Sequence, residues 1–188
     1  LEDHVRATFA LTRADLEKLR KRVLSKWDIV ETGEESEPPR LSSFVLTCAY
    51  AVVCIAKAIH GVKKEKEKFS FGFTVDCRAR LEPPIPDNYF GNCVWGRLVD
   101  ADPLDFIKEE AFVIIAKSID RSNRFGVYGS DFGWGKPAKV EITSVDRALT
   151  IGLAESKDGN GGVEVGLVLN KHVMDLFATL FRHGVSDE

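Results

Sequence analysis

The sequence predicts an α+β fold in two layers, a mixed and mostly antiparallel sheet with flanking helices, and three observations favour this class. The first is the strand-like alternation of apolar and polar residues at 5–11, 69–78 and 163–169. The second is the helical spacing of apolar residues at 13–27, 44–59, 102–119 and 171–182. The third is the stretch KDGNGG at 157–162, which is typical of a hairpin loop.

The first expected strand, 5–11, runs directly into the first expected helix. Thr12 and Asp15 have the spacing of a capping box, with Asp in place of the usual Glu. Apolar residues follow at helical spacing: Leu16, Leu19, Val23 and Leu24. The basic run at 18–26 is therefore expected to be the solvated face of this helix rather than a phosphate site.

Residues 44–59 are apolar almost all round a helix, so this helix is expected to be buried. Ser42 or Ser43 is placed to cap its start, and Gly61 is expected to end it. The apolar segment is short for a transmembrane span and is interrupted by a lysine, so no span is expected. The lysine-rich stretch 63–68 is expected to be a charged surface turn.

The strand expected at 69–78 carries charged residues toward its end. If its pleat continues, Asp76, Arg78 and Arg80 share one face, because side chains alternate with a period of two. The segment 82–86, EPPIP, cannot continue a ladder, because proline lacks the N–H donor. A turn at 89–93 then leads into another strand.

The C-terminal third is expected to hold the remaining strands and a closing helix. Strands at 139–142 and 148–153 precede the hairpin loop, and a strand at 163–169 follows it. The helix at 171–182 closes the chain.

The composition is that of an ordinary globular protein, with 44% hydrophobic and 29% charged residues among 188. A net charge of -3 argues against a nucleic-acid or membrane-surface partner. The four cysteines form no CxxC pair, so reduced thiols in the core and a cytoplasmic location are expected. The histidines and cysteines show no metal-ligand spacing, so no metal is expected, and no signal peptide is recognisable.

The segment 131–137, DFGWGKP, concentrates two glycines, two large rings and one acid. Its glycines permit backbone angles or close approaches that a side chain forbids. Phe132 and Trp134 are large enough to form a small hydrophobic cluster, and Asp131 needs a cation or backbone donors if it is covered. By composition alone, the segment is a tight turn with a satellite apolar cluster.

Four motifs in order give the sequence a resemblance to the plant BAHD acyltransferases. The segment 131–137 resembles that family's DFGWG-[KR]-P signature, and 75–86, VDCRARLEPPIP, resembles its DxRxR stretch followed by PPxP. YFGNC at 89–93 is similar to the motif of the branch that acylates anthocyanin, flavonoid and other phenolic glucosides, often with malonyl groups. Ser43 with Phe44 corresponds to the family's SF helix start.

The resemblance implies two similar α/β domains with a channel between them, which the CoA thioester and the acceptor enter from opposite faces. It implies a catalytic His in an HxxxDG motif of the first domain, which deprotonates the acceptor hydroxyl and later protonates the CoA thiolate. The HxxxD match here, 183–187, follows the signature instead of preceding it and lacks the glycine, so we expect it to be accidental. His4, His60 and His172 have no such context.

Residues 1–188 are therefore expected to be one C-terminal acyltransferase domain, half of a two-domain enzyme, with no catalytic residue of its own. The sequence lacks an initiator Met, which agrees with that expectation. The partners expected are an acyl-CoA, a phenolic glucoside acceptor and the N-terminal half of the same enzyme, with no permanently bound cofactor. The half alone is expected to be inactive.

The resemblance also implies roles for particular residues. CoA contacts are expected from a helix start and from the lysine turn after it: Ser42, Ser43, Lys63 and Lys64. The acceptor pocket is expected to include three polar residues: Ser122, Asn123 and Arg124. The structural motifs supply the rest: Arg78, Arg80, Tyr89, Phe90, Gly91, Asn92, Asp131, Phe132, Gly133, Trp134 and Gly135.

The resemblance further implies one ion pair that holds the signature loop in place. Arg80 is favoured narrowly over Arg78 as the partner of Asp131, whose role is then structural rather than catalytic. The Trp134 N–H is a candidate oxyanion donor, although packing of the indole is favoured.

The function that the resemblance implies is transfer of an acyl group from CoA to a hydroxyl of a phenolic or flavonoid glucoside. Within the family, the YFGNC motif indicates malonyl as the acyl group. The alternative is a non-catalytic half-domain that binds CoA or a partner. An HxxxDG segment upstream in the native gene product, or one that co-purifies with the chain, distinguishes the two.

Overall fold

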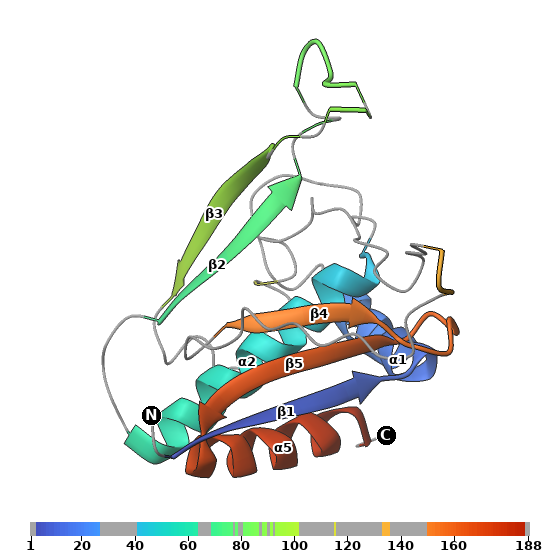
Figure 1. The fold of residues 1–188 in the computed structure, drawn as a ribbon. Helices are drawn as coiled ribbons and strands as arrows, with labels where there is room; N and C mark the ends of the chain where they lie inside the picture. Colours follow the sequence, from blue (N-terminus) through green and yellow to red (C-terminus); the bar gives the residue numbers. More distant parts are fainter. Residues whose placement is uncertain are drawn as a thin grey trace.

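The computed structural model describes residues 3–26, 41–63, 69–76, 78, 81–86, 88–89, 91, 93–101, 115, 133–135 and 150–186. Within them the elements follow in the order β1 (His4–Leu11), α1 (Arg13–Ser25), α2 (Ser43–Lys63), β2 (Phe69–Asp76), β3 (Val94–Ala101), β4 (Ile151–Glu155), β5 (Val163–Asn170) and α5 (Lys171–Ser186) (Figure 1). The expected α+β class, with antiparallel sheet and flanking helices, is confirmed. The strand expected at 139–142 and the helix expected at 102–119 lie almost entirely outside the described residues.

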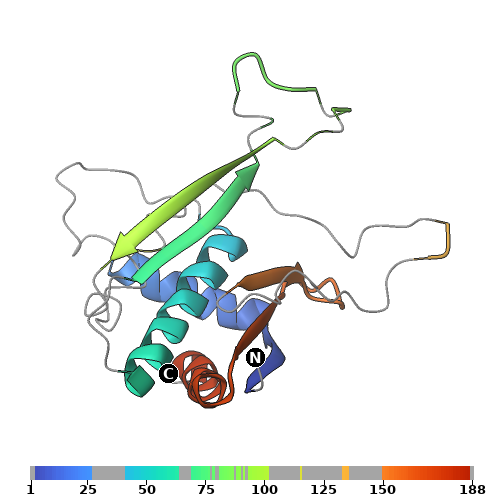
Figure 2. The same cartoon turned by 60° about the vertical axis from the view of Figure 1, so that its left-hand side comes forward.

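The main sheet has the order β1-β5-β4, and both pairings are antiparallel. The register places Phe9 opposite Val165 and Val165 opposite Leu153, so apolar residues of the three strands share one face. The helices gather on one side of this sheet (Figure 2). The hairpin expected at 157–162 is confirmed as the connection of β4 to β5.

Helix α2 is the central element of the core, as its all-round apolar sequence predicts. Its buried side chains include Val45, Leu46 and Val52, each at most 1% exposed. Among the described helices it is the one long and apolar enough to cross a membrane. However, 78% of its 18-residue apolar segment, Ser43–His60, is buried inside the protein. The helix continues to Lys63 rather than ending at Gly61. A helical glycine costs only about 1 kcal/mol relative to alanine, which the packing of the preceding turns offsets.

Helix α5 covers the open side of α2 with an aromatic seam. Phe177 packs edge-on against Phe9 of β1, with ring centroids 5.0 Å apart. Phe181 lies 5.0 Å from the ring of Tyr50 in α2. The Tyr50 hydroxyl donates to the Phe181 carbonyl oxygen at 2.7 Å, which ties the last turns of α5 to the core helix.

Helix α1 begins with the expected capping box. The Asp15 N–H donates to the Thr12 Oγ1 at 3.1 Å, and the Thr12 N–H donates to the Asp15 carboxylate at 2.9 Å. The basic face of this helix also contacts the end of α5, in addition to solvent. Lys18 Nζ donates to the Val185 carbonyl at 3.1 Å and Arg22 Nη1 to the Gly184 carbonyl at 3.4 Å, so these cations meet the C-terminal end of the α5 dipole.

Strands β2 and β3 pair antiparallel over their whole length and form an arm that projects away from the helices in both views (Figures 1 and 2). Phe71 and Phe73 anchor the described part of the arm to the edge of the core. The strand ends at Asp76, so the pleat expected to continue to Arg80 stops earlier. Arg78 therefore does not share a strand face with Asp76, because it lies in the loop beyond the last paired residue.

Two of the cysteines are buried free thiols, as predicted. Cys48 and Cys54 are each 4% exposed, and Cys93 is half-buried and free. Burial raises the pKa of Cys54 to about 12 and raises the pKa of Cys48 as well. Both thiols are therefore held in the unreactive protonated form.

We expect Cys48 and Cys54 to resist alkylation at pH 8 in the folded protein, while Cys93 reacts. With its pKa near 12, only about one part in ten thousand of the Cys54 thiol is thiolate at that pH. Peptide mass spectrometry after iodoacetamide treatment measures each site, and denatured protein is the control in which all three react. Labelling of Cys54 at the rate of Cys93 would contradict the burial of α2.

Gly184→Ala is expected to destabilise the protein, although glycine to alanine within a helix ordinarily stabilises by about 1 kcal/mol. A Cβ at this position lies 2.5 Å from the hydroxyl oxygen of Tyr50, which is buried and held by its hydrogen bond. Forced overlap of this kind costs about 1–3 kcal/mol. After the helix gain of about 1 kcal/mol is subtracted, the net loss is up to about 2 kcal/mol, or a Tm lower by up to about 8 °C. Thermal unfolding measures it.

The control for that substitution is Tyr50→Phe, which deletes the nearest atom. The double variant is expected to lose less stability than the sum of the two single losses, because the clash and the hydroxyl are removed together. Simple additivity in this cycle would show that Gly184 and Tyr50 do not compete for the same space.

Candidate functional site

The start of α2 is capped by a serine and carries no acidic residue. The Val45 N–H donates to Ser42 Oγ at 3.2 Å, which identifies Ser42 as the cap, and the Leu46 N–H donates to the Ser42 carbonyl at 3.1 Å. Ser43 is 8% exposed at the first helical position. No acidic residue lies in the first turn. The positive end of the helix dipole is therefore not neutralised by its own first turn.

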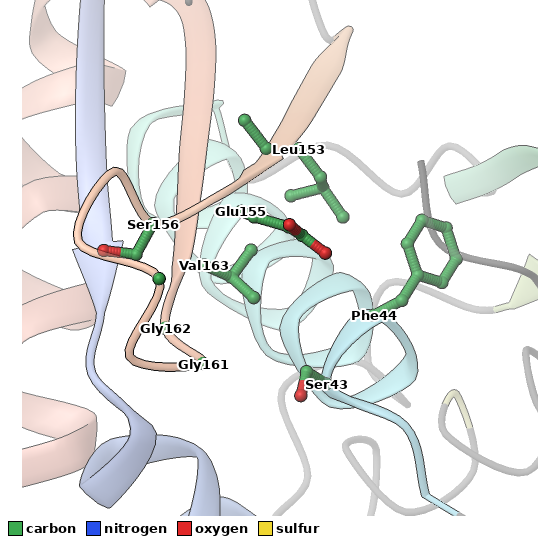
Figure 3. Close-up of a pocket in the computed structure, with 10 residues that line it drawn as sticks. Ser43, Phe44, Leu153, Glu155, Ser156, Gly161, Gly162 and Val163 are labelled. Atoms are coloured by element: carbon green, nitrogen blue, oxygen red, sulfur yellow. The ribbon is translucent and has the colours of Figure 1, made fainter. Parts of the chain in front are cut away.

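A cavity of about 170 Å³ lies between this helix end and the β4–β5 hairpin (Figure 3). It is mainly apolar and includes one carboxylate. The lining residues are Ser43, Phe44, Leu153, Ala154, Glu155, Ser156, Gly159, Gly161, Gly162 and Val163. The sequence therefore located one wall of the cavity, the helix start, and missed the other.

The hairpin wall is held in shape by its own hydrogen bonds. The Ser156 N–H donates to the Gly162 carbonyl at 3.0 Å, and Ser156 Oγ donates to the Asp158 carboxylate at 2.7 Å. This bond and two from Asn160 lower the pKa of Asp158. Gly162 is required by packing, because a Cβ there would lie 2.8 Å from the Leu11 carbonyl oxygen. The density of glycines at 159–162 was the sequence signal that this loop approaches another part of the chain closely.

The tip of the β2–β3 arm joins two of the sequence motifs. Arg78 Nη2 donates to the Gly91 carbonyl at 2.9 Å, and the Ile85 N–H donates to the Arg78 carbonyl at 2.9 Å. A Cβ on Gly91 would overlap the ring of Tyr89 where it now lies, so a side chain at this position would require that ring to move. The DxRxR and YFGNC motifs therefore meet in one folded loop, and the Arg78 side chain braces that loop.

The signature loop is described only at its centre. Gly133 and Gly135 have φ of 97° and 91°, which confirms that this turn needs glycine. Trp134 is 93% exposed, so the packing favoured for its indole is not present in this structure. The expected Arg80–Asp131 ion pair lies outside the described residues, so it stays a prediction.

The structure separates two of the groups expected at the CoA site. Ser43 is the first residue of α2 and Lys63 the last. At 1.5 Å per residue they are about 30 Å apart, so they cannot contact the same phosphate. The side chain of Lys63 is not described. The remaining predicted site residues lie outside the described part of the chain: Lys64, Phe90, Asn92, Ser122, Asn123, Arg124 and Phe132.

No histidine among the described residues lines the cavity. His183 is exposed on the last turns of α5, and the expectation that the HxxxD match at 183–187 is accidental stays a prediction. His4 and His172 are exposed on β1 and at the start of α5. Within the described ranges no group of three His, Cys, Asp or Glu is arranged to hold a metal ion.

Comparison with known proteins gives one family and a consistent set of relatives. The model of the Transferase family matches residues 2–124 and 119–183. The chain is 36% identical to phenolic glucoside malonyltransferase 1 and 38% identical to malonyl-CoA:anthocyanidin 5-O-glucoside-6''-O-malonyltransferase, both from Arabidopsis thaliana. These alignments cover 98% and 97% of this chain but 46% and 47% of the relatives. The chain therefore spans about half the length of the curated relatives it matches.

Solved structures support the fold at lower sequence similarity. Vinorine synthase matches with a TM-score of 0.68 and 20% identity, over 94% of this chain and 46% of its own. TRI101 of F. graminearum, complexed with coenzyme A and deoxynivalenol, matches with a TM-score of 0.65 and 13% identity, over 92% of this chain and 46% of its own.

Arg78→Ala is expected to loosen the arm without unfolding the core. A hydrogen bond from a charged donor contributes about 1.5–3 kcal/mol, so local opening of the loop should rise about tenfold or more. Limited chymotrypsin digestion measures this, because Tyr89 is half exposed on the loop. Arg182→Ala, an exposed arginine on α5, is the control. Equal cleavage rates at Tyr89 in both variants would show that Arg78 does not brace the loop.

Proposed function

The chain belongs to the Transferase family, the family of the BAHD acyltransferases, and from this premise we propose that it moves an acyl group from CoA to a hydroxyl of a phenolic or flavonoid glucoside. We propose malonyl as the acyl group. The observation that carries this choice is the similarity, at 34–38% identity across 97–98% of the chain, to three malonyltransferases that act on phenolic or anthocyanidin glucosides by their names. Residues 1–188 are proposed to form one C-terminal domain of such an enzyme.

The proposed reaction needs one base and a bound thioester. The base takes the proton of the acceptor hydroxyl while the oxygen attacks the malonyl thioester carbonyl, and the tetrahedral intermediate then expels CoA thiolate, which receives that proton. We propose that the base belongs to a partner domain, equivalent to the part of the relatives that this chain does not cover.

This domain's proposed share of the work is to bind CoA at the start of α2. The helix end carries partial positive charge, Ser42 and Ser43 lie at its first turn, and a cavity opens beside it. Lys63 and Lys64 lie at or beyond the other end of α2, so we do not place them at the same phosphate. The buried thiols of Cys48 and Cys54 agree with the cytoplasmic location that we propose.

The chain alone is expected to bind CoA without transferring malonyl, and joined to the missing half of a relative it is expected to gain activity. The experiment is a malonyl-transfer assay on a phenolic glucoside with malonyl-CoA, run on the 188-residue chain and on a fusion to the uncovered part of the Arabidopsis phenolic glucoside malonyltransferase 1. Mass spectrometry of the glucoside detects the product. The unfused mixture of both parts is the control for spontaneous assembly.

Two results would overturn the proposal. Transfer by the chain alone would show that it holds its own base. A folded fusion that binds malonyl-CoA but acylates no glucoside would favour the non-catalytic half-domain instead.

A further inference from the structure

The β4–β5 hairpin contains an asparagine followed directly by a glycine, Asn160 and Gly161, and this is the one such pair in the sequence. The side-chain amide of an asparagine is open to attack by the backbone nitrogen of the next residue, which closes a succinimide ring. Glycine permits this attack best, because it has no Cβ to hinder the approach. Both residues are exposed, so water reaches the reacting atoms.

The backbone nitrogen that would attack is not held by a hydrogen bond. Within the described ranges no hydrogen bond of the Gly161 N–H is found. Asn170 offers the contrast, because the N–H of the following Lys171 donates to the Asp3 carbonyl at 2.9 Å. A bonded N–H must give up its partner before it loses its proton and attacks, so the structure protects Asn170 and leaves Asn160 open.

We propose that Asn160 is a site of spontaneous deamidation, and that its conversion to a carboxylate loosens the hairpin. Solvent base first takes the Gly161 N–H proton, the nitrogen bonds to Cγ of Asn160, and the bond from Cγ to Nδ2 breaks. The amide nitrogen leaves as ammonia with one proton returned from solvent. Water then opens the ring: cleavage at Cγ yields aspartate, and cleavage at the main-chain carbonyl carbon yields isoaspartate, whose main chain runs through Cγ. No oxidant or reductant takes part.

The hydrogen bonds of Asp158 give this reaction a structural consequence. Asn160 Nδ2 donates to Asp158 Oδ2 at 2.9 Å, and the Asn160 N–H donates to Asp158 Oδ1 at 3.2 Å. A carboxylate at position 160 has no proton to donate, so the first bond is replaced by the approach of two negative groups. Ser156 Oγ donates to the same Asp158 carboxylate at 2.7 Å, so displacement of Asp158 also disturbs the residue at which the loop closes.

The altered loop is a wall of the cavity beside α2. Gly159 and Gly161 flank Asn160 in the chain, and both line the cavity together with Ser156 (Figure 3). Isoaspartate adds one carbon to the main chain between these two glycines, so it changes the length of the wall as well as its charge. Hydrolysis does not restore the amide, so altered chains accumulate. The shape of this wall therefore changes with the age of the protein.

The first experiment follows deamidation of the folded 188-residue chain at pH 8 in water labelled with heavy oxygen. Peptide mass spectrometry measures the label gained at each asparagine, and electron-transfer fragmentation separates aspartate from isoaspartate. We expect Asn160 to react at least about tenfold faster than Asn170, because Gly161 has neither a Cβ nor a hydrogen bond on its nitrogen. Equal rates at the two asparagines would overturn the assignment.

The same chain unfolded in urea separates the effect of the structure from that of the sequence. Unfolding removes the hydrogen bond that protects Asn170, so the ratio of the two rates should fall by about threefold or more. A ratio that is the same in the folded and unfolded chains would overturn the role given to the unbonded Gly161 nitrogen.

The second experiment measures the consequence through amide hydrogen exchange by NMR at Ser156, whose N–H donates to the Gly162 carbonyl at 3.0 Å. In Asn160→Asp we expect this amide to exchange about threefold faster, because one hydrogen bond is lost and two exposed charges repel. Asn160→Ala, which removes the donor without adding charge, should give a smaller increase. The amides of α2 serve as the reference for any loss of global stability.

The matched control is Asn170→Asp, which makes the same chemical change at the end of β5. Asn170 Oδ1 accepts from the His172 N–H at 3.1 Å, and an aspartate keeps that acceptor, so exchange at Ser156 should not change. Exchange at Ser156 that is unaltered in Asn160→Asp would overturn the loosening of the hairpin. Equal increases in Asn160→Asp and Asn160→Ala would overturn the part assigned to charge.

Discussion

Burial of α2 on all sides is the constraint on which the rest of the structure depends. A helix that is apolar almost all round has no face for water, so the chain must cover every side of it. The three-stranded sheet, α1 and α5 do so, and each brings its own apolar stripe to the same core. Among the described residues, few polar groups are carried into this core. Tyr50 is the clearest case, and its hydroxyl is satisfied by the carbonyl oxygens of α5.

The same burial creates the candidate site. When α2 is held against the sheet, its first turn faces the β4–β5 hairpin, and the end of the sheet becomes the second wall of a cavity. Gly162 allows the hairpin to lie close to Leu11 at the end of β1. The hydrogen bond from the Ser156 N–H to the Gly162 carbonyl joins the two ends of the hairpin loop. Core packing and ligand binding thus share one set of contacts. A substitution that shifts the hairpin away from Leu11 changes both the stability of the sheet and the shape of the cavity.

The arm formed by β2 and β3 is held by fewer described contacts with the core than the helices are. Its described anchors to the core are the rings of Phe71 and Phe73, while its tip is held by the hydrogen bond from Arg78 to Gly91. The tip exposes Leu81 and Tyr89, which are 46% and 50% exposed. The arginine is therefore a brace within the loop. The DxRxR and YFGNC motifs thus share a structural role, the hydrogen bond between Arg78 and Gly91. This role is separate from the ion pair predicted between Arg80 and the signature loop.

The sequence by itself determined the local structure and the family of this protein. Strand and helix periods, the Thr12–Asp15 capping box, the Ser42 cap and the hairpin at 157–162 depend on neighbours in the chain, so they were predictable. The ordered motifs likewise indicated the family. Only the tertiary structure decided that α2 passes through Gly61, that Lys63 is far from Ser43, and that Trp134 is exposed. It alone placed Glu155 opposite Phe44, because residues distant in sequence meet only when long-range packing of the sheet on α2 brings them together.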